Sequence, residues 1–287
     1  RLIKGWTVDD NIQAPDAAKL AVHWFESKQN EVAAEVADLF SKYRLSEALM
    51  AVYKLFWDEF SSWYLEMIKP AYGQGIDRTT YDATLCFLDN LLHLLHPFMP
   101  FITEELWQQM YERNAEEGES LMVSALSMDT YVDTAFVAQF EVVKGVISNI
   151  RSIRLQKNIA QKEPLDLQVL GENPVAEFNA VIQKMCNLSS ITVVESKAEG
   201  ASSFMVGTTE YAVPLGNMID VEAEIARMEA ELKHKEGFLQ GVLKKLSNEK
   251  FVNNAPAAVL EMERKKQADA ESIISSLKES IAALKKA

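Results

Sequence analysis

The chain has 287 residues, of which 48% are hydrophobic and 25% charged, and its formal net charge is −13. These proportions are typical of a folded globular protein, and the length predicts two domains with room for a small third. No run of 18 apolar residues occurs, which excludes a transmembrane helix. The two cysteines, Cys86 and Cys186, are far apart, so a disulfide framework is excluded, a structural zinc site is not favoured, and a reducing cytoplasm is expected.

The acidic charge is unevenly distributed. Residues 220–287 hold 12 Lys or Arg and 12 Asp or Glu, so the whole acidic excess lies in residues 1–219. A net charge of −13 argues against a nucleic-acid partner, but the distribution decides more than the sum. The neutral C-terminal part therefore remains a candidate for contact with a polyanion. The chain begins with Arg1 rather than Met, from which we expect either processing or a piece of a longer protein.

The N-terminal part is predicted to be a bundle of helices. After a polar connector at 1–15, apolar residues recur every three or four positions over 16–40, 46–69, 79–96 and 103–110. This is the spacing of amphipathic helices, and prolines and glycines separate them. Four or more helices with short connections predict a helical bundle.

One of these helices carries an aromatic stripe formed by Phe56, Trp57, Phe60, Trp63 and Tyr64. Such side chains could stack on unpaired bases. Their spacing also fits a packed helix core, and this second interpretation is favoured for the first three residues of the stripe.

A small α+β unit is expected next. Apolar spacing predicts a helix over 142–156 and another over 175–185. Short β-like runs, bounded by glycine and proline, lie on both sides of the second helix. These runs are 165–170, 191–194, 204–206 and 211–213.

The C-terminal segment shows the clearest periodicity. Residues 221–246 place apolar side chains at seven of eight a and d positions of a heptad repeat, and a second run of the same repeat follows over 260–284. Two helices of matched length joined by a turn predict an antiparallel coiled-coil hairpin. The heptad seam is poor near Leu260 and Gln267, so the tip is expected to be looser than the base.

No catalytic constellation is recognisable in the chain. His93 and His96 lie three apart in an apolar run, whereas zinc-binding helices place histidines four apart, so a core or helix-end position is favoured. The glycine-rich phosphate motifs and the serine nucleophile elbow are absent, and Gly73 and Gly75 are interpreted as part of a loop. We therefore expect no catalytic residue, metal site or cofactor site here.

Positive charge gathers in two places, the end of the 142–156 helix and the expected hairpin tip. The candidate phosphate contacts are Arg151, Arg154, Lys157, Lys244, Lys245, Lys250, Arg264, Lys265 and Lys266. The two arginines are three apart, so they are expected on one helix face. Phosphate contact would be salt-sensitive and independent of base sequence. The alternative, a solvated charged face, is what most charge runs are, and composition leaves both open.

Specific stretches resemble one family of enzymes. Residues 57–66 read WDEFSSWYLE and resemble the W-D-x-F-C-x-W-Y-L-E signature of valyl- and isoleucyl-tRNA synthetase anticodon domains, with Ser61 in place of the usual cysteine. Residues 94–107 read LLHPFMPFITEELW, which is similar to a long run in the same domains. Residues 150–154 read IRSIR, which is similar to the I-R-x-I-R that follows the bundle in that family.

The C-terminal part separates the members of this family. Residues 213–224 together with KLSNEKFVNNAP at 245–256 resemble the arm of valyl-tRNA synthetases of bacterial type. Isoleucyl enzymes commonly end in a cysteine-rich zinc module, which this chain lacks. The resemblance implies a mostly α C-terminal fragment with three parts: a helical anticodon-binding bundle at 1–137, an α+β connector at 138–218 and an antiparallel coiled-coil tRNA-binding arm at 219–287.

The resemblance also implies a function. The full enzyme would join valine to its tRNA with ATP and Mg²⁺ and would hydrolyse mischarged threonine, because a hydrophobic pocket rejects that isostere only about a hundredfold. The H-I-G-H and K-M-S-K-S signatures are absent, so this fragment should be inactive alone. The expected partner is a valine-specific tRNA, not DNA or a membrane, for a cytoplasmic monomer.

Two alternatives stay open. One is the equivalent region of an isoleucyl- or leucyl-type synthetase, which upstream sequence would distinguish. The other is a protein-interaction module that uses the coiled coil. That alternative predicts apolar residues outside the heptad seam, and Phe238 and Phe251 are the main ones.

Overall fold

The structure is a computed structural model. It describes residues 6–110, 120–126, 128–215, 221–247, 260–264, 266–267, 270–271, 274 and 278, with the backbone alone at 221–228 and 231. The chain divides into two compact units, Arg1–Pro214 and Leu215–Ala287. Each unit is described by itself below.

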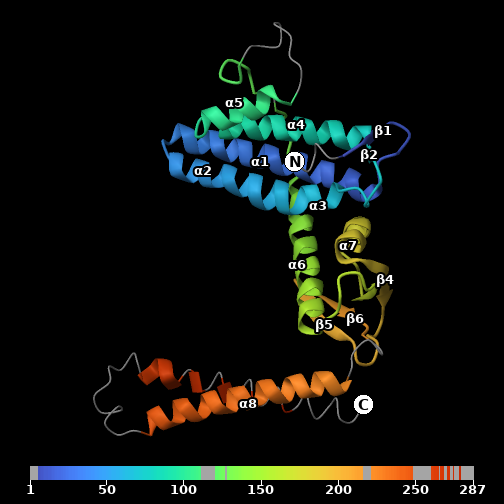
Figure 1. Cartoon of the computed structure of the whole chain (residues 1–287), viewed down its shortest axis with the longest axis vertical. Coiled ribbons are helices and arrows are strands. Elements are labelled where there is room, and N and C mark those ends of the chain that lie inside the picture. Colours follow the sequence, from blue (N-terminus) through green and yellow to red (C-terminus); the bar gives the residue numbers. More distant parts are fainter. Residues whose placement is uncertain are drawn as a thin grey trace. The chain divides into compact units, whose positions relative to one another are not determined.

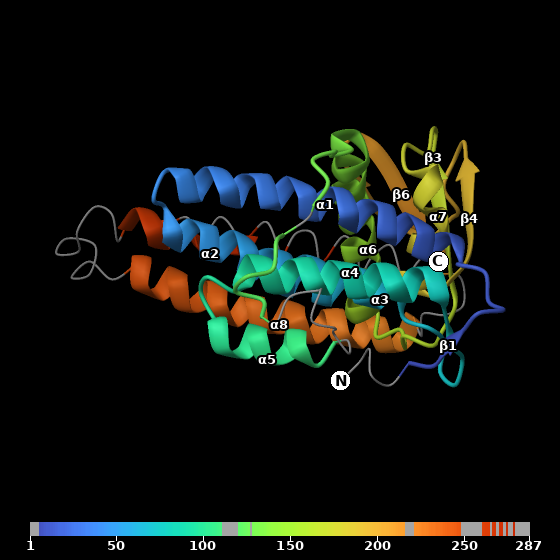
Figure 2. The ribbon, with the colours of Figure 1, turned by 90° about the horizontal axis from the view of Figure 1, so that it is seen from above.

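The first unit begins with a bundle of helices (Figure 1). The elements are α1 (Asp16–Ser41), α2 (Leu45–Lys54), η2 (Leu55–Tyr64), α3 (Leu65–Ile68), α4 (Arg78–Leu95) and α5 (Pro100–Gln108). Seen from above, α1, α2 and α4 run alongside one another (Figure 2). The four helical segments predicted for this part are confirmed, and so is the mostly α fold class.

The expected helix over 46–69 is continuous along the chain but changes type in the middle. Its central ten residues, η2, form a π-helix, which is rare at this length and occurs frequently at functional sites. The wider turn directs Phe60 into the core, where it is 3% exposed, whereas Trp57 is 59% exposed. The prediction that Trp57 is a core residue is therefore wrong, whereas that for Phe60 is confirmed.

Aromatic rings fill the centre of the bundle. The Phe25 ring lies 5.3 Å from Phe60, 5.0 Å from Tyr64 and 5.1 Å from Phe87 between ring centroids. Ring pairs at these separations add about 0.5–1.5 kcal/mol each beyond the burial of their area. The Tyr64 hydroxyl lies 2.8 Å from the hydroxyl of Thr84, so this buried polar group has a partner.

Two helices begin at aspartate caps. The Asp77 carboxylate accepts a hydrogen bond of 2.8 Å from the backbone N–H of Thr80 at the start of α4. The Asp133 carboxylate accepts one of 3.0 Å from Phe136 at the start of α6 (Thr134–Gln156). Because of this cap α6 begins eight residues before the predicted 142–156 helix, and Phe140 lies buried in its added turns.

A four-stranded sheet follows α6. Its elements are β3 (Leu165–Leu170), η3 (Ala176–Phe178), α7 (Asn179–Cys186), β4 (Leu188–Val194), β5 (Ser202–Val206) and β6 (Thr209–Val213). The strand order is β4-β3-β6-β5, with β3 and β4 parallel and the other neighbours antiparallel. The four predicted β runs and the helix between the first two are confirmed.

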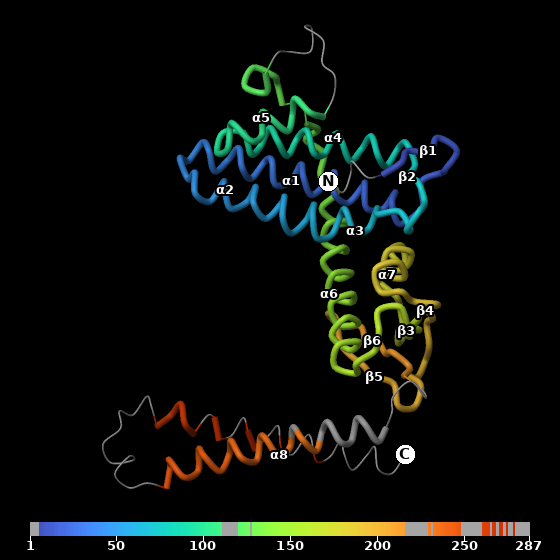
Figure 3. The backbone as a smooth tube through the Cα atoms, viewed as in Figure 1, coloured from blue at the N-terminus to red at the C-terminus, as the bar shows by residue number. Residues whose placement is uncertain are grey.

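Helix α6 joins the bundle to the sheet (Figure 3). At one end Phe140 packs on Trp24, with ring centroids 4.1 Å apart. At the middle of the helix Gly145 lies against β5, where an added Cβ would be 3.0 Å from Val206 Cγ1. The boundary expected between the bundle and the α+β connector, at residues 137 and 138, falls inside α6, so this helix belongs to both parts.

The residues expected to form only a polar connector contain a short strand. Here β1 (Val8–Asp9) pairs in parallel with β2 (Ile76–Asp77), which directly precedes α4. An ion pair of 2.8 Å between Arg78 and Asp10 joins the same two segments. These contacts hold the connector against the end of the bundle.

The second unit contains α8 (Val221–Leu246) and helical residues at 260–264 and 266–267. The helix predicted over 221–246 is confirmed. Across the described parts of the chain, no helix combines the length and apolar character that crossing a membrane requires.

Candidate RNA interface

Arg154 is the most deeply buried of the candidate phosphate contacts. It is 1% exposed, and its guanidinium donates hydrogen bonds to the carbonyl oxygens of Ala160 at 2.9 Å and Cys186 at 2.7 Å. Burial lowers the pKa of this guanidinium from its usual value. The expectation that Arg154 meets a phosphate does not fit this placement, because the side chain ties the end of α6 to α7 instead.

Arg151, three residues earlier, is exposed on α6. Its guanidinium carbon lies 5.6 Å from the centroid of the Trp63 ring, within the range of a cation–π contact. Lys144 lies on the same helix, and its Nζ is 2.6 Å from the Glu59 carboxylate and 2.8 Å from that of Glu141. The charge of Lys144 is thus neutralised within the chain, whereas Arg151 presents its charge at the surface.

Lys157 is the C-cap residue of α6 and is partly exposed. A cation at this position is also favoured by the negative end of the helix dipole. Together with Arg151 it supplies the positive charge at the end of this helix. Of the three residues proposed there, two are therefore placed at the surface.

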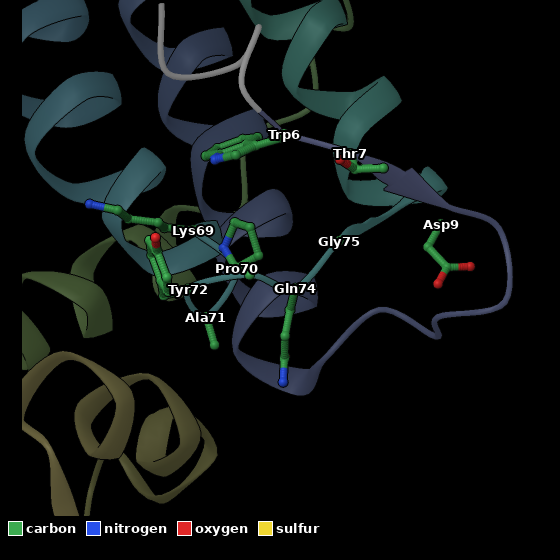
Figure 4. A pocket seen from close by; sticks show the side chains of 10 residues that line it. Trp6, Thr7, Asp9, Lys69, Pro70, Ala71, Tyr72, Gln74 and Gly75 are labelled. Carbon is green, nitrogen blue, oxygen red and sulfur yellow. The ribbon is translucent and has the colours of Figure 1, made fainter.

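A pocket of about 540 Å³ lies at the end of the bundle that β1 and β2 close (Figure 4). It is lined by Trp6, Thr7 and Asp9, which precede α1, and by residues 69–75, which lie between α3 and β2. In Figure 4 the side chains of Trp6, Lys69 and Tyr72 lie on the same side of the pocket, and Asp9 lies on the far side. Tyr72 is fully exposed, so its ring is open to a ligand.

Two glycines give the pocket its wall. Gly73 has a φ of +78°, a backbone conformation that glycine adopts without strain. A Cβ at Gly75 would lie only 2.8 Å from the backbone oxygen of Thr7, which accepts a hydrogen bond of 2.9 Å from Ile76. Glycine at this position therefore lets the loop approach β1 closely enough to close the pocket.

The lining of this pocket suits an unstacked nucleobase. Trp6 and Tyr72 offer aromatic surface for stacking, Gln74 offers an amide for hydrogen bonding, and Lys69 offers a cation for a phosphate. The sequence pattern does not predict this pocket, because the glycines around Gly73 indicate only a loop. The available signal was two large aromatic residues in otherwise polar, glycine-rich segments.

In the second unit, Lys244, Lys245 and Arg264 are exposed and Lys266 is partly exposed. The remaining two candidates of the arm, Lys250 and Lys265, lie outside the described residues. Two of these cations, Lys245 and Lys266, lie near one another because both approach the carboxylate of Glu263.

Glu263 is 6% exposed. Its oxygens lie 2.7 Å from Lys266 Nζ and 3.8 Å from Lys245 Nζ. The hydrogen bond from Lys266 and the charge of Lys245 hold the pKa of Glu263 below its usual value. Glu263 thus links α8 to the helical residues after 260.

The two histidines have structural hydrogen bonds, as favoured from their sequence context. His93 Nε2 lies 2.8 Å from Ser124 Oγ, and His96 Nδ1 lies 2.8 Å from Thr103 Oγ1. Within the described residues, no group of three or more His, Cys, Asp or Glu side chains could hold a metal ion.

Two family models match the chain. The anticodon-binding domain of tRNA ligase matches residues 22–169, from within α1 to the last but one residue of β3. The valyl tRNA synthetase tRNA binding arm matches residues 220–285, which include α8. The first match covers more than half of the chain and lies in the first compact unit, and the second lies in the other unit.

Curated relatives agree with these matches. The chain is 99% identical to the valine–tRNA ligase of Bacteroides thetaiotaomicron, 72% identical to that of Phocaeicola vulgatus and 70% identical to that of Bacteroides fragilis. The alignments cover 99–100% of this chain but only 32–33% of each relative, so the chain spans about a third of the length of these relatives. The chain belongs to the family of tRNA ligases with this anticodon-binding domain, and within it to the valyl-tRNA synthetases.

Proposed function

We propose that this chain is the tRNA-binding part of a valine–tRNA ligase. The observation that carries the proposal is the pair of family matches, at 22–169 and 220–285, because both families are named for contact with tRNA. The three relatives named above align over essentially the whole chain, and each carries the name of the valine enzyme, so an isoleucyl or leucyl type is not favoured.

The bundle would bind the anticodon stem-loop. Bases at the tip of an RNA loop are unstacked, so they can be held by aromatic rings and hydrogen-bonding groups. The pocket between Trp6 and Tyr72 has this composition, and we propose that it takes one such base. Arg151 and Lys157 would contact phosphates of the same stem-loop, since both present positive charge at the surface.

The arm would be an antiparallel coiled-coil hairpin. Val242, Ala270 and Ile274 are all predicted heptad seam positions, and all are buried. Two ion pairs cross between the helices, Glu236–Lys278 at 2.8 Å and Lys245–Glu263 at 3.8 Å. From the first pair to the second the residue number rises on α8, from 236 to 245, and falls in the partner segment, from 278 to 263. This is the pattern of antiparallel pairing.

The exposed cations of the arm would reach the outer corner of the tRNA, where the D and T loops meet. They are Lys244, Lys245, Arg264 and Lys266, with Lys250 and Lys265 as further candidates. Phosphate contact by such residues carries little base information and fixes orientation. The arm would therefore strengthen binding while the bundle selects the tRNA.

The full-length ligase would attach valine to its tRNA with ATP and Mg²⁺ and would remove mischarged threonine. Since the chain spans about a third of the first relative's length, we assign these reactions to the remaining two thirds of the full-length ligase. We propose the functional division 1–137, 138–218 and 219–287 for bundle, connector and arm, with α6 shared between the first two. A cytoplasmic monomer remains our expectation.

A coiled-coil docking module for another protein is the second candidate function. Its support is the exposed Phe238 on α8, which is 47% exposed. The two functions differ in their ligand, since the docking module would bind an apolar protein surface and would be indifferent to added RNA.

A charge-removal experiment on the arm tests the proposed function. Lys244→Ala should weaken binding of valine tRNA and reduce the slope of log affinity against log salt by about one for each lost phosphate contact. Lys233→Ala is the matched control, because it removes the same charge from an exposed position on the same helix nearer its start. Equal effects of the two variants would contradict a specific contact at the tip.

A further inference from the structure

An apolar surface runs along the outer side of α2 and the start of η2, which form one edge of the bundle (Figure 1). The residues of this α2 face are Leu45, Leu49, Met50, Tyr53 and Trp57, which are 49%, 39%, 52%, 54% and 59% exposed. Four of them recur at every fourth position and therefore lie on one side of the helix. The opposite side packs into the core through the buried Ala48, Val52 and Leu55.

The turn before α2 presents one more aromatic ring beside this face. Tyr43 is 90% exposed and has a φ of +58°, in the left-handed region that favours glycine. This residue ends α1, because the Arg44 N–H donates to the Leu39 carbonyl and the Tyr43 N–H donates to the Phe40 carbonyl, as in a Schellman cap. The cap itself needs no aromatic side chain, and the exposed ring adds to the apolar surface at the start of α2.

The composition of the α2 face is that of an interface core. Aromatic residues and methionine are enriched at the centre of protein interfaces, and charged residues form their rim. Here the rim contains two internally satisfied pairs, Lys42 with Asp38 at 2.6 Å and Arg44 with Glu47, and one further exposed cation, Lys54. Since Lys42 and Arg44 are already paired with carboxylates, and the negative charge of Asp58 balances that of Lys54, the surroundings do not favour a phosphate backbone.

We infer that the α2 face is an internal interface of the full-length ligase, covered by an apolar protein surface from the part of the enzyme that this chain does not span. The relatives are about three times as long as the chain, which covers 33% of the first of them, so a large protein surface is available within one molecule. An exposed apolar patch of this kind on a soluble protein marks an interaction site. The inference rests on the proposal that the chain is part of such a ligase.

Side-chain labelling tests this inference directly. The readouts are oxidation of Met50 and hydroxyl-radical labelling of Tyr53 and Trp57, each compared between this chain and the full-length valine–tRNA ligase of Bacteroides thetaiotaomicron, both without tRNA. A change from about half exposed to the burial of an interface core should remove most of the labelling of these three residues. Met205, 57% exposed on β5, is the internal control and should be labelled equally in both proteins.

Three results would overturn the inference. Equal labelling of the α2 face in both proteins would show that it stays open, and protection that needs added tRNA would make it an RNA contact. Protection in the chain alone at high concentration, accompanied by a dimer in light scattering, would make it a contact between copies. If the chain binds tRNA while the face stays open in the full-length enzyme, the interface fails but the proposed function stands.

A pair of substitutions gives a second readout. Leu49→Glu should leave the thermal midpoint of this chain unchanged, because the side chain is exposed, and should lower that of the full-length ligase. Met205→Glu should change the thermal midpoint of neither protein. An equal loss in chain and ligase for Leu49→Glu would show an effect on folding of the bundle and would contradict the inference.

Discussion

The guanidinium of Arg154 donates a hydrogen bond of 2.7 Å to the main-chain carbonyl of Cys186, across from the last turn of α6. It also donates at 2.9 Å to the carbonyl of Ala160. A buried cation held by carbonyl dipoles fixes the loop after α6 and the end of α7 to one another. Arg151, three residues earlier on the same helix, is exposed.

Loss of this brace should reduce stability rather than RNA affinity. In Arg154→Met the carbonyls of Cys186 and Ala160 lose their charged donor, so the free energy of unfolding should fall by about 2–4 kcal/mol. Urea unfolding measures the change. If Arg154→Met unfolds like the parent chain but no longer binds tRNA, the structural role assigned to Arg154 is refuted.

Arg151 should show the opposite behaviour. Arg151→Ala removes an exposed charge and a cation–π contact with Trp63, so stability should change by less than about 1 kcal/mol. The slope of log affinity against log salt for valine tRNA should fall by about one, and Arg151→Lys should retain the parent slope. An unchanged slope in Arg151→Ala would remove this residue from the interface.

Tyr72 should contribute to base stacking in the pocket. Replacing it with alanine should weaken tRNA binding by about 1–3 kcal/mol, the usual contribution of one base–aromatic stack. The thermal midpoint should not move, because the ring is fully exposed. Tyr131→Ala, at another exposed tyrosine, is the control. Equal affinities for Tyr72→Ala and Tyr131→Ala would argue against a base at this position.

The cap of α6 should make stability depend on pH. The hydrogen bonds from Phe136 N–H and His23 hold the pKa of Asp133 below its usual value of 3.8. A depressed folded pKa stabilises the protein above the unfolded pKa, and the contribution is lost as pH falls through the folded value. The urea concentration at the midpoint of unfolding should therefore fall as the pH is lowered below about 4, and it should fall less in Asp133→Asn. Asp58→Asn, at an exposed position, should keep the full pH dependence of the parent chain.

Much of the fold follows from local patterns in the sequence. The helices α1, α4 and α8 and the four strands of the sheet lie where apolar periodicity predicts them. These elements are long or strongly patterned, so one chain segment carries enough information to define each. The short pair β1–β2 was missed, because two residues per strand show no period and their pairing joins segments far apart in the sequence.

The site was less predictable than the fold. Arg151 and Arg154 are alike in sequence context, and only tertiary packing makes one of them exposed and the other buried. The aromatic stripe alone favours a core position for Trp57, whereas in the structure this residue continues the exposed positions Leu45, Leu49 and Tyr53 at four-residue spacing and lies at the surface. The pocket around Tyr72 depends on two loops that meet in space, which no local pattern reveals.

Binding of this chain to tRNA across a salt series shows whether it is a tRNA-binding protein. Valine tRNA and an unrelated tRNA would be titrated at several salt concentrations, with affinity read by filter binding or fluorescence anisotropy. We expect tighter binding of valine tRNA at every salt concentration, and affinities that fall steeply as salt rises. Equal and salt-insensitive binding of the two tRNAs, or no binding of either, would contradict this expectation.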